Sequence, residues 1–154
     1  MFLERVCKTL GKHKIPFAIV GGHAVALHGA VRGTVDIDFV IRWTQANLQQ
    51  TEQALTELGL TSRLPISADD VFRNREDYIE QRNRIDWNFY NSNSQDEQLD
   101  LIINYDLGSL VPVIFNLEGT EIPVLDIDSL IAMKMKSGRP QDLADVDALE
   151  RIRQ

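Results

Sequence analysis

The sequence predicts an α+β fold: a small mixed β-sheet flanked by helices, with a helix pair at its C-terminal end. Two observations favour this class. Segments with apolar residues at helical spacing alternate with short apolar runs bounded by glycine or proline. The short runs are spaced too irregularly for a repeated doubly wound unit. The length of 154 residues suits one domain covering residues 1–154.

The first part of the chain is expected to form three helices and two strands. Leu3, Val6, Cys7 and Leu10 lie on one helical stripe, which ends before Pro16. A buried strand follows, then a short helix that Gly29 closes. The expected helices cover residues 1–12, 23–28 and 45–58, and the expected strands cover residues 17–20 and 34–41.

The remaining chain is expected to add strands and the C-terminal helix pair. Residues 84–90 alternate in polarity, which indicates a strand, and the polar residues 91–96 indicate a loop. Asp126 or Asp128 is expected to cap one late helix, and Pro140 suits the first turn of the last. The expected helices cover residues 68–82, 126–137 and 140–152, and the expected strands cover residues 84–90, 98–104 and parts of 110–125 around a turn at Glu118-Gly119.

The composition narrows the possible functions. The net charge of −7 argues against a general nucleic-acid coat protein, because phosphate neutralisation needs clustered Lys and Arg. The single cysteine, Cys7, cannot form an internal disulfide. The N-terminal residues lack the apolar core of a secretory signal, and no apolar run is long enough to span a membrane. We therefore expect a cytoplasmic protein without membrane contact.

Two acids, Asp36 and Asp38, lie one residue apart in an apolar run. Side chains of a strand alternate between its faces, so both carboxylates are expected on one face, with Cβ atoms roughly 6–7 Å apart. Ile37 and Phe39 then point to the other face. Two anions this close need a proton or a cation between them, and Mg²⁺ or Mn²⁺ prefers such oxygen ligands. From the spacing alone, two solvated acids are the simpler interpretation.

The glycine pair Gly21-Gly22 changes that interpretation. Glycines between a strand and a helix let the backbone approach a ligand, and the N-terminus of a helix favours a phosphate. Taken alone, the pair would indicate only a tight turn. A phosphate seat and an acid pair within residues 21–38 together predict a site for a metal–triphosphate complex.

The stretch GGHAVALHGAVRGTVDID, residues 21–38, resembles the nucleotidyltransferase superfamily that includes DNA polymerase beta and kanamycin nucleotidyltransferase. It is most similar to small stand-alone members, the toxin-type nucleotidyltransferases of abortive-infection and toxin–antitoxin systems. These carry Gly-Gly followed by Arg-x-Thr-x-Asp-Ile-Asp. The resemblance implies a nucleotidyltransferase-like fold with metal ligands at Asp36 and Asp38. It implies nucleotide-binding roles for Gly21, Gly22, Arg32 and Thr34.

The stretch LIAMKMKSGRPQDLADVDAL, residues 130–149, is similar to the helix pair that follows the catalytic sheet in the same group. The usual pattern there is Leu-Lys followed by Arg-x-Lys-Asp-x-x-Asp. Lys134 and Arg139 match two of its basic positions, whereas Gln141 stands where a lysine is common. The resemblance implies that Lys134 and Arg139 contact the triphosphate or brace the acids. The alternative for Arg139 is a structural salt bridge to Asp142 or Asp145.

A third acid and a histidine complete the expected site. Two-metal nucleotidyl transfer needs a third carboxylate on a neighbouring strand. Asp100 is a lone acid in an apolar run, where burial is costly without a partner. Asp86 is the competitor, although its strand pattern favours a position facing water. His23, directly after the glycines, is a candidate for contact with phosphate or ribose, with capping or packing as the alternative.

We therefore expect a metal-dependent nucleotidyltransferase with catalytic Asp36, Asp38 and Asp100. Its cofactor is expected to be Mg²⁺ or Mn²⁺, and its substrate a nucleoside triphosphate, with ATP among the candidates. The NMP would pass to a hydroxyl of RNA such as tRNA, of a protein or of a small molecule. A chain this short has little room to bind the acceptor, so a protein partner is expected to help. The alternative is a non-catalytic nucleotide-binding or regulatory member of a toxin–antitoxin-type pair with the same fold.

Overall fold

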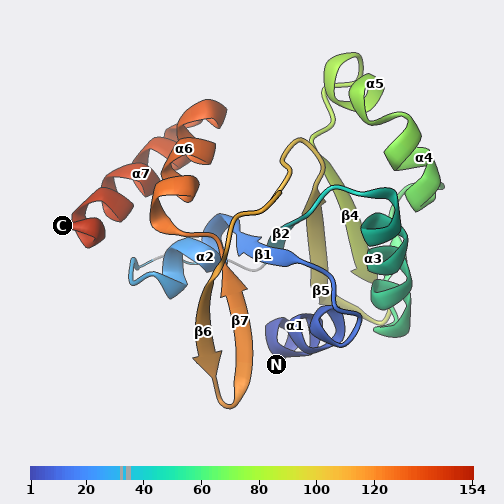
Figure 1. The fold of residues 1–154 in the computed structure, drawn as a ribbon, viewed down its shortest axis with the longest axis horizontal. Coiled ribbons are helices and arrows are strands. Elements are labelled where there is room, and N and C mark those ends of the chain that lie inside the picture. The colour runs from blue at the N-terminus through green and yellow to red at the C-terminus, as the bar shows by residue number, and fades with distance from the viewer. Residues whose placement is uncertain (32, 34–35) are drawn as a thin grey trace.

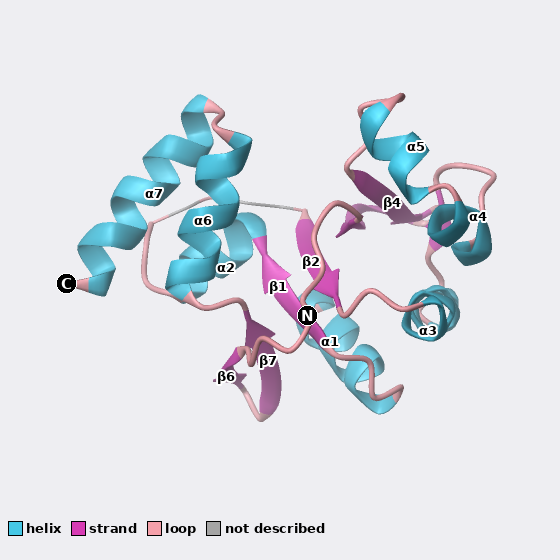
Figure 2. Cartoon of the chain, turned by 45° about the horizontal axis from the view of Figure 1, so that its top comes forward, coloured by secondary structure: helices cyan, strands magenta, loops and turns pink. Residues whose placement is uncertain are grey.

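A computed structural model describes residues 1–31, 33 and 36–154. Its strands form one mixed sheet in the order β3-β4-β5-β2-β1-β7-β6 (Figures 1 and 2). Strand β1 pairs antiparallel with β2 and parallel with β7, while β2 pairs parallel with β5. The predicted α+β class is therefore confirmed. The strands are β1 Phe17–Val20, β2 Ile37–Ile41, β3 Thr61–Ser62, β4 Asp86–Asn91, β5 Ser94–Ile102, β6 Val113–Leu117 and β7 Thr120–Val124.

The helices lie in separate groups around this sheet. Figure 1 shows α6 and α7 on the same side as α2, and α4 and α5 on the opposite side, where α4 lies next to α3. Helix α1 contacts both β7 and α3. In the described residues, the helices are α1 Phe2–Lys12, α2 Gly21–Leu27, α3 Gln45–Glu57, α4 Ala68–Arg73, α5 Arg75–Glu80, α6 Ile127–Ser137 and α7 Pro140–Arg153.

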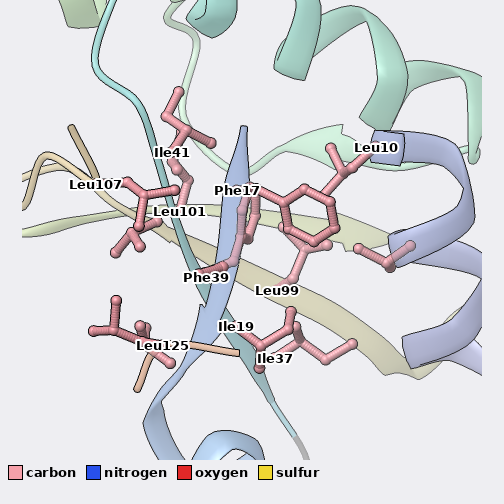
Figure 3. Packing of buried hydrophobic residues seen from close by; sticks show 14 of the residues in the cluster. Leu10, Phe17, Ile19, Ile37, Phe39, Ile41, Leu99, Leu101, Leu107 and Leu125 are labelled. Carbon is pink, nitrogen blue, oxygen red and sulfur yellow. The ribbon is translucent and has the colours of Figure 1, made fainter. Parts of the chain in front are cut away.

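One part of the hydrophobic core lies on the face of β2 and β5 that is turned away from the predicted acids, whereas β1 is buried on both faces. Ile37 and Phe39 of β2 pair with Leu99 and Leu101 of β5, and all four side chains are buried. Leu10 of α1 belongs to the same cluster (Figure 3). Because strand side chains alternate, the residues between these positions point to the opposite face of the sheet. That opposite face carries the predicted acids.

Several local predictions were wrong in detail. Residues 68–82 form two short helices instead of one, because Asn74 leaves the helical conformation (φ −109°, ψ 18°) and separates α4 from α5. A capping box between Ser67 and Asp70 starts α4. Strand β3 was not predicted, and the expected loop at 91–96 shrinks to a turn between Asn91 and Ser94. Helix α2 begins at the glycines instead of after them.

The C-terminal helix pair agrees with the prediction. Asp126 caps α6, since its Oδ2 accepts a hydrogen bond from the amide of Ser129 at 3.0 Å. Gly138 ends α6 in the left-handed conformation, φ 68°, and Pro140 opens α7. Helices α6 and α7 pack against each other. Among the described helices, none is long and apolar enough to cross a membrane.

Candidate active site

Asp38 and Asp100 lie side by side on the face opposite the core. They are direct partners in the parallel register of β2 and β5, and their neighbours Ile37, Phe39 and Leu99 are buried. The alternation argument thus places Asp38 correctly. Asp36 lies one residue before β2 and is exposed. The pairing joins two strands that are distant in the sequence and brings the predicted second and third acids together.

Burial and mutual repulsion govern the charge of these acids. Burial raises the pKa of Asp38 to about 7, and the negative charges of Asp100, Asp36 and Asp86 add to this shift. Burial also raises the pKa of Asp100, against a hydrogen bond from Asn88 that lowers it. Such a site favours a proton or a cation over two bare carboxylates. Its all-oxygen donors fit Mg²⁺ or Mn²⁺.

Metal binding itself stays a prediction. Within the described part of the chain, no three His, Cys, Asp or Glu side chains are grouped so as to hold a metal ion. The strand pattern of Asp86 indicated a side chain that faces solvent, and the structure differs from this prediction. Asp86 is half-buried on β4, two residues from Asn88, and Asn88 is the register partner of Asp100. Asp86 therefore shares the face of Asp38 and Asp100 and contributes to their raised pKa values.

Gly21 provides the space for the Asp38 carboxylate. It follows Val20, the register partner of Asp38, and has φ +67°. A Cβ at Gly21 would lie 2.2 Å from Oδ2 of Asp38, well inside van der Waals contact. Position 21 thus requires glycine for two reasons: the Asp38 carboxylate leaves no room for a Cβ, and the backbone has a positive φ. Its predicted phosphate contact, and that of Gly22, remain predictions.

A cavity of ≈ 520 Å³ opens next to Asp38, between the sheet and α6. One part of its wall is apolar and includes one tyrosine ring; the other carries carboxylate, amide, hydroxyl and cationic groups. The first part comprises Val20, Ile85, Ile102, Tyr105, Leu130 and Met133. The second includes Asp38, Asn104, Ser129, Lys136, Ser137 and Arg139. An amphipathic ligand with an anionic end matches this wall.

The predicted cation Lys134 is committed to a buried ion-pair network. It is 7% exposed, and its Nζ lies 2.9 Å from Oδ2 of Asp145 and 3.7 Å from Oδ1 of Asp142. Gln141, which replaces the expected lysine, donates to Oδ1 of Asp145 at 3.2 Å. Lys134 also lines the cavity and lowers the pKa of Asp38. Its position therefore fits the bracing role better than direct phosphate binding, and both roles stay predictions.

Arg139 makes the salt bridge that was its alternative prediction. Its Nε lies 2.8 Å from Oδ2 of Asp142, yet 73% of its side chain is exposed at the cavity. Lys136 lines the same cavity and, among the described residues, has no ion pair. Its spacing two residues after Lys134 was the signal that the two lysines face different surroundings.

Three predicted nucleotide contacts lie away from the cavity or outside the described residues. His23 is half-buried on α2, and its Nε2 is buried without a hydrogen-bond partner among the described residues. Arg32 and Thr34 lie outside the described residues. Asn88 was missed, although it alternates with buried Trp87 and Phe89 and so had to lie on the face of the acids.

Solved structures with a similar fold are described as nucleotidyltransferases, adenylyltransferases or nucleotidyltransferase-like proteins. A nucleotidyltransferase-like protein from Paracoccidioides brasiliensis matches with a TM-score of 0.61 and 17% identity, over 96% of this chain and 72% of that one. A putative nucleotidyltransferase from Thermotoga maritima matches at 0.60 and 13%, over 94% and 88%. The lincomycin-bound lincosamide antibiotic adenylyltransferase LnuA matches at 0.58 and 16%, over 92% and 90%. The fold is therefore that of the nucleotidyltransferases.

The sequence gives a narrower assignment than the fold. Residues 3–154 match the family described as nucleotidyl transferase AbiEii toxin, type IV TA system, and the chain belongs to this family. No curated protein matches the sequence. The predicted membership of a toxin-type nucleotidyltransferase family is thus confirmed. The family is one of transferases, which agrees with the predicted enzyme class.

Proposed function

We propose that the protein transfers a nucleoside monophosphate from an NTP to an acceptor hydroxyl: the hydroxyl oxygen bonds to the α-phosphorus, the bond to the β-phosphate oxygen breaks, and pyrophosphate leaves. The observation that carries the proposal is the Asp38–Asp100 pair, of which Asp38 lines a cavity that also presents Lys136 and Arg139. Acids on one side and cations on the other suit a reaction in which a polyphosphate meets a metal-binding group. The LnuA neighbour, an adenylyltransferase, is consistent with this type of transfer.

In the proposed complex, the triphosphate lies along the polar wall of the cavity. Lys136 and the exposed face of Arg139 are the cations with free reach, and Ser137 adds a hydroxyl donor. Gly21 and Gly22 would bring backbone amides close to the β- and γ-phosphates. The base would contact the apolar part, where Tyr105, Ile102 and Met133 offer flat and flexible surfaces.

Asp36, Asp38 and Asp100 would hold Mg²⁺ or Mn²⁺. When bound, the ion would neutralise phosphate charge and lower the pKa of the acceptor hydroxyl. Asp100, on the strand next to Asp38, is the residue we assign to orienting that hydroxyl and receiving its proton. The raised pKa of Asp38 supports the need for a cation here, because without one the site retains a proton.

The acceptor is the open part of the proposal. An RNA such as tRNA, a protein hydroxyl and a small molecule all fit the chemistry. Wild-type protein incubated with each [α-³²P]NTP, Mg²⁺ and a cell lysate would be fractionated into RNA, protein and small molecules. We expect label in one fraction. The double variant Asp36→Ala plus Asp38→Ala should lose it, while Asp96→Asn, an exposed acid on the same strand as Asp100, should keep it.

Two outcomes would overturn the proposal. If the double variant labels the acceptor as well as the wild type does, the assignment of the acids is wrong. If calorimetry finds no binding of Mg²⁺ or of any NTP to the wild type, the non-catalytic regulatory alternative replaces it.

A further inference from the structure

A chain of hydrogen bonds runs from the edge of the sheet to the carboxylate of Asp100. Nε of Arg63 donates to Oδ1 of Asn88 at 2.7 Å. Nδ2 of Asn88 then donates to Oδ1 of Asp100 at 2.8 Å. Arg63 follows the short edge strand β3, whereas Asn88 is the register partner of Asp100 on β4. Hydrogen bonds thus link residues from three segments of the chain, and the last of these bonds ends at one oxygen of the Asp100 carboxylate.

Arg63 fixes which way the Asn88 amide faces. An asparagine presents an acceptor oxygen and a donor nitrogen that differ little in shape, so its orientation depends on its partners. The cationic Nε of Arg63 can only donate, so it selects the amide oxygen and turns the nitrogen towards Asp100. The nitrogen also reaches the carbonyl of Leu99 at 3.3 Å. Every polar atom of this amide therefore has a partner, and only one orientation satisfies them.

Arg63 is itself held in place from two directions. Its backbone amide donates to the carbonyl of Asn88 at 3.0 Å. Its guanidinium lies over the ring of Tyr90, 4.3 Å from the centroid. The side chain is otherwise exposed to solvent. An exposed arginine restrained in this way suits a steady donor to Asn88 better than a mobile surface charge.

We propose that Asn88 and Arg63 are positioning residues that hold Asp100 for nucleotidyl transfer. The inference rests on the proposed function. Asp100 lies next to Asp38, with Asp36 and Asp86 close enough to affect its charge. A freely rotating carboxylate here would turn away from the negative charges of Asp36 and Asp86. The Asn88 bond anchors Oδ1 of Asp100; in the metal-free protein the carboxylate also accepts a hydrogen bond from Asp38, which a metal ion or the acceptor hydroxyl would replace.

A purely structural role predicts a different outcome. Strands β4 and β5 already pair over six register positions, so the Asn88 side chain is a small part of their association. If Asn88 only joined the strands, its loss would lower thermal stability and leave metal affinity and turnover unchanged. A positioning role predicts a large loss of metal affinity and turnover with little loss of thermal stability. Removing a hydrogen-bond partner of a metal-binding carboxylate typically lowers metal affinity or activity by about 10–100-fold.

The test compares Asn88→Ala, Arg63→Ala, the double variant and Gln98→Ala. Gln98 lies on β5 two residues before Asp100 and, among the described residues, has no side-chain hydrogen bond, so it is the matched control. Calorimetry would measure Mn²⁺ affinity, and steady-state assays would separate kcat from the KM for NTP. Thermal unfolding would report on the fold. Arg63→Ala, at an exposed position, keeps the test valid if Asn88→Ala unfolds.

We expect Asn88→Ala to lower Mn²⁺ affinity and kcat by about 10–100-fold each, with the KM for NTP within about threefold. Arg63→Ala should act in the same direction but less. The double variant should match Asn88→Ala, because both residues act through one bond. The inference is wrong if both single variants bind Mn²⁺ and turn over like Gln98→Ala. Failure of the wild type to bind Mn²⁺ and NTP would instead overturn the proposed function, and this inference with it.

Discussion

The side chain of Asp38 fills the space that a side chain at position 21 would need, so Asp38 can lie where it does only because residue 21 is glycine. A Cβ on Gly21 would lie 2.2 Å from Oδ2 of Asp38 and 3.0 Å from its Cβ and Cγ. Gly21 follows β1 as the first residue of α2, and its neighbour Val20 is the register partner of Asp38. The position of the carboxylate thus depends on the absence of a side chain at the first residue of α2. This relationship links the two halves of the 21–38 motif physically.

We predict that Gly21→Ala separates these two residues at a cost in both stability and activity. Alanine at φ +67° costs about 1–2 kcal/mol, and the clash forces the Asp38 side chain to move. We expect transfer activity to fall by about 100-fold or more, since misplacement of about 1 Å at a reacting centre has an effect of this size. Enzyme assays and thermal unfolding would measure the two effects.

Gly11→Ala is the control for this prediction. A Cβ at Gly11, inside α1, would meet nothing within 4 Å. It should raise stability by about 0.5–1 kcal/mol, as alanine does in a helix, and leave activity unchanged. Equal activity of the two alanine variants would show that the Gly21–Asp38 approach does not matter.

Asp38→Asn should stabilise the metal-free protein at neutral and alkaline pH. The folded state holds a proton on Asp38 up to a pKa of about 7, whereas the unfolded chain releases it near 3.8. Through this residue, stability falls as the pH rises between these two values. The variant should exceed the wild type by about 2–4 kcal/mol at pH 8, and the gap should close towards pH 4.

Urea unfolding in EDTA across this pH range would check the prediction. The exposed Asp96→Asn variant should show no such pH-dependent gain. A stability difference between Asp38→Asn and wild type that stays constant from pH 4 to pH 8 contradicts the raised pKa.

Lys134 and Lys136 should respond differently to substitution. Lys134→Met leaves Asp142 and Asp145 buried without their ammonium partner, so we expect a loss of about 3–5 kcal/mol. Lys136→Ala should change stability by less than about 0.5 kcal/mol, because the side chain is exposed. It should weaken NTP binding about tenfold through the loss of a cation at the cavity. Thermal unfolding and calorimetry with NTP would separate the effects; similar stability losses in both variants would refute the distinction.

Substitutions of Asp86 and Asp100 should differ in their effect on turnover, although the charges of both residues raise the pKa of Asp38. Asp100→Asn should lower turnover by about 100-fold or more, as expected for a group that acts directly on the reaction. Asp86→Asn should keep turnover within about threefold of the wild type. We assign Asp86 no contact with the metal ion or the substrate, and its charge only repels those of Asp38 and Asp100. Single-turnover assays at saturating Mg²⁺ would compare them. Equal losses would move Asp86 into the catalytic set.

Local alternation predicted the face of Asp38 but not that of Asp86, and Asp100 was expected beside Asp38 from two-metal chemistry and the family resemblance instead of from a local pattern. Alternation with Ile37 and Phe39 was enough to place Asp38 opposite the core. The pairing of Asp38 with Asp100 depends on the order of strands in the sheet, which joins β2 to β5 and has no local signature. For the same reason Asn88 was missed: its role follows from register with Asp100, a relationship between two strands.

The cations were the least predictable part of the site. Lys134 is apart from Asp145 in sequence and meets it only because α6 and α7 pack together. A motif predicts that the residues matter, whereas the geometry decides whether a lysine faces a phosphate or a carboxylate. The division of 68–82 into α4 and α5 has a similar origin, since the backbone of a single residue, Asn74, interrupts a pattern that otherwise favours one helix.

The pairing of β2 with β5 also determines when, during synthesis of the chain, the candidate active site can form. The glycines, Asp36 and Asp38 leave the ribosome long before Asp100 and the Lys134 network. Chains grow at about 5–20 residues per second, so for several seconds the nascent protein holds the first two acids without the third. The early segment also lacks β5, against which β2 must pair to hold Asp38 in place. A truncated product that ends before β5 should therefore be inert, and the full set of acids is assembled only when most of the chain has been made.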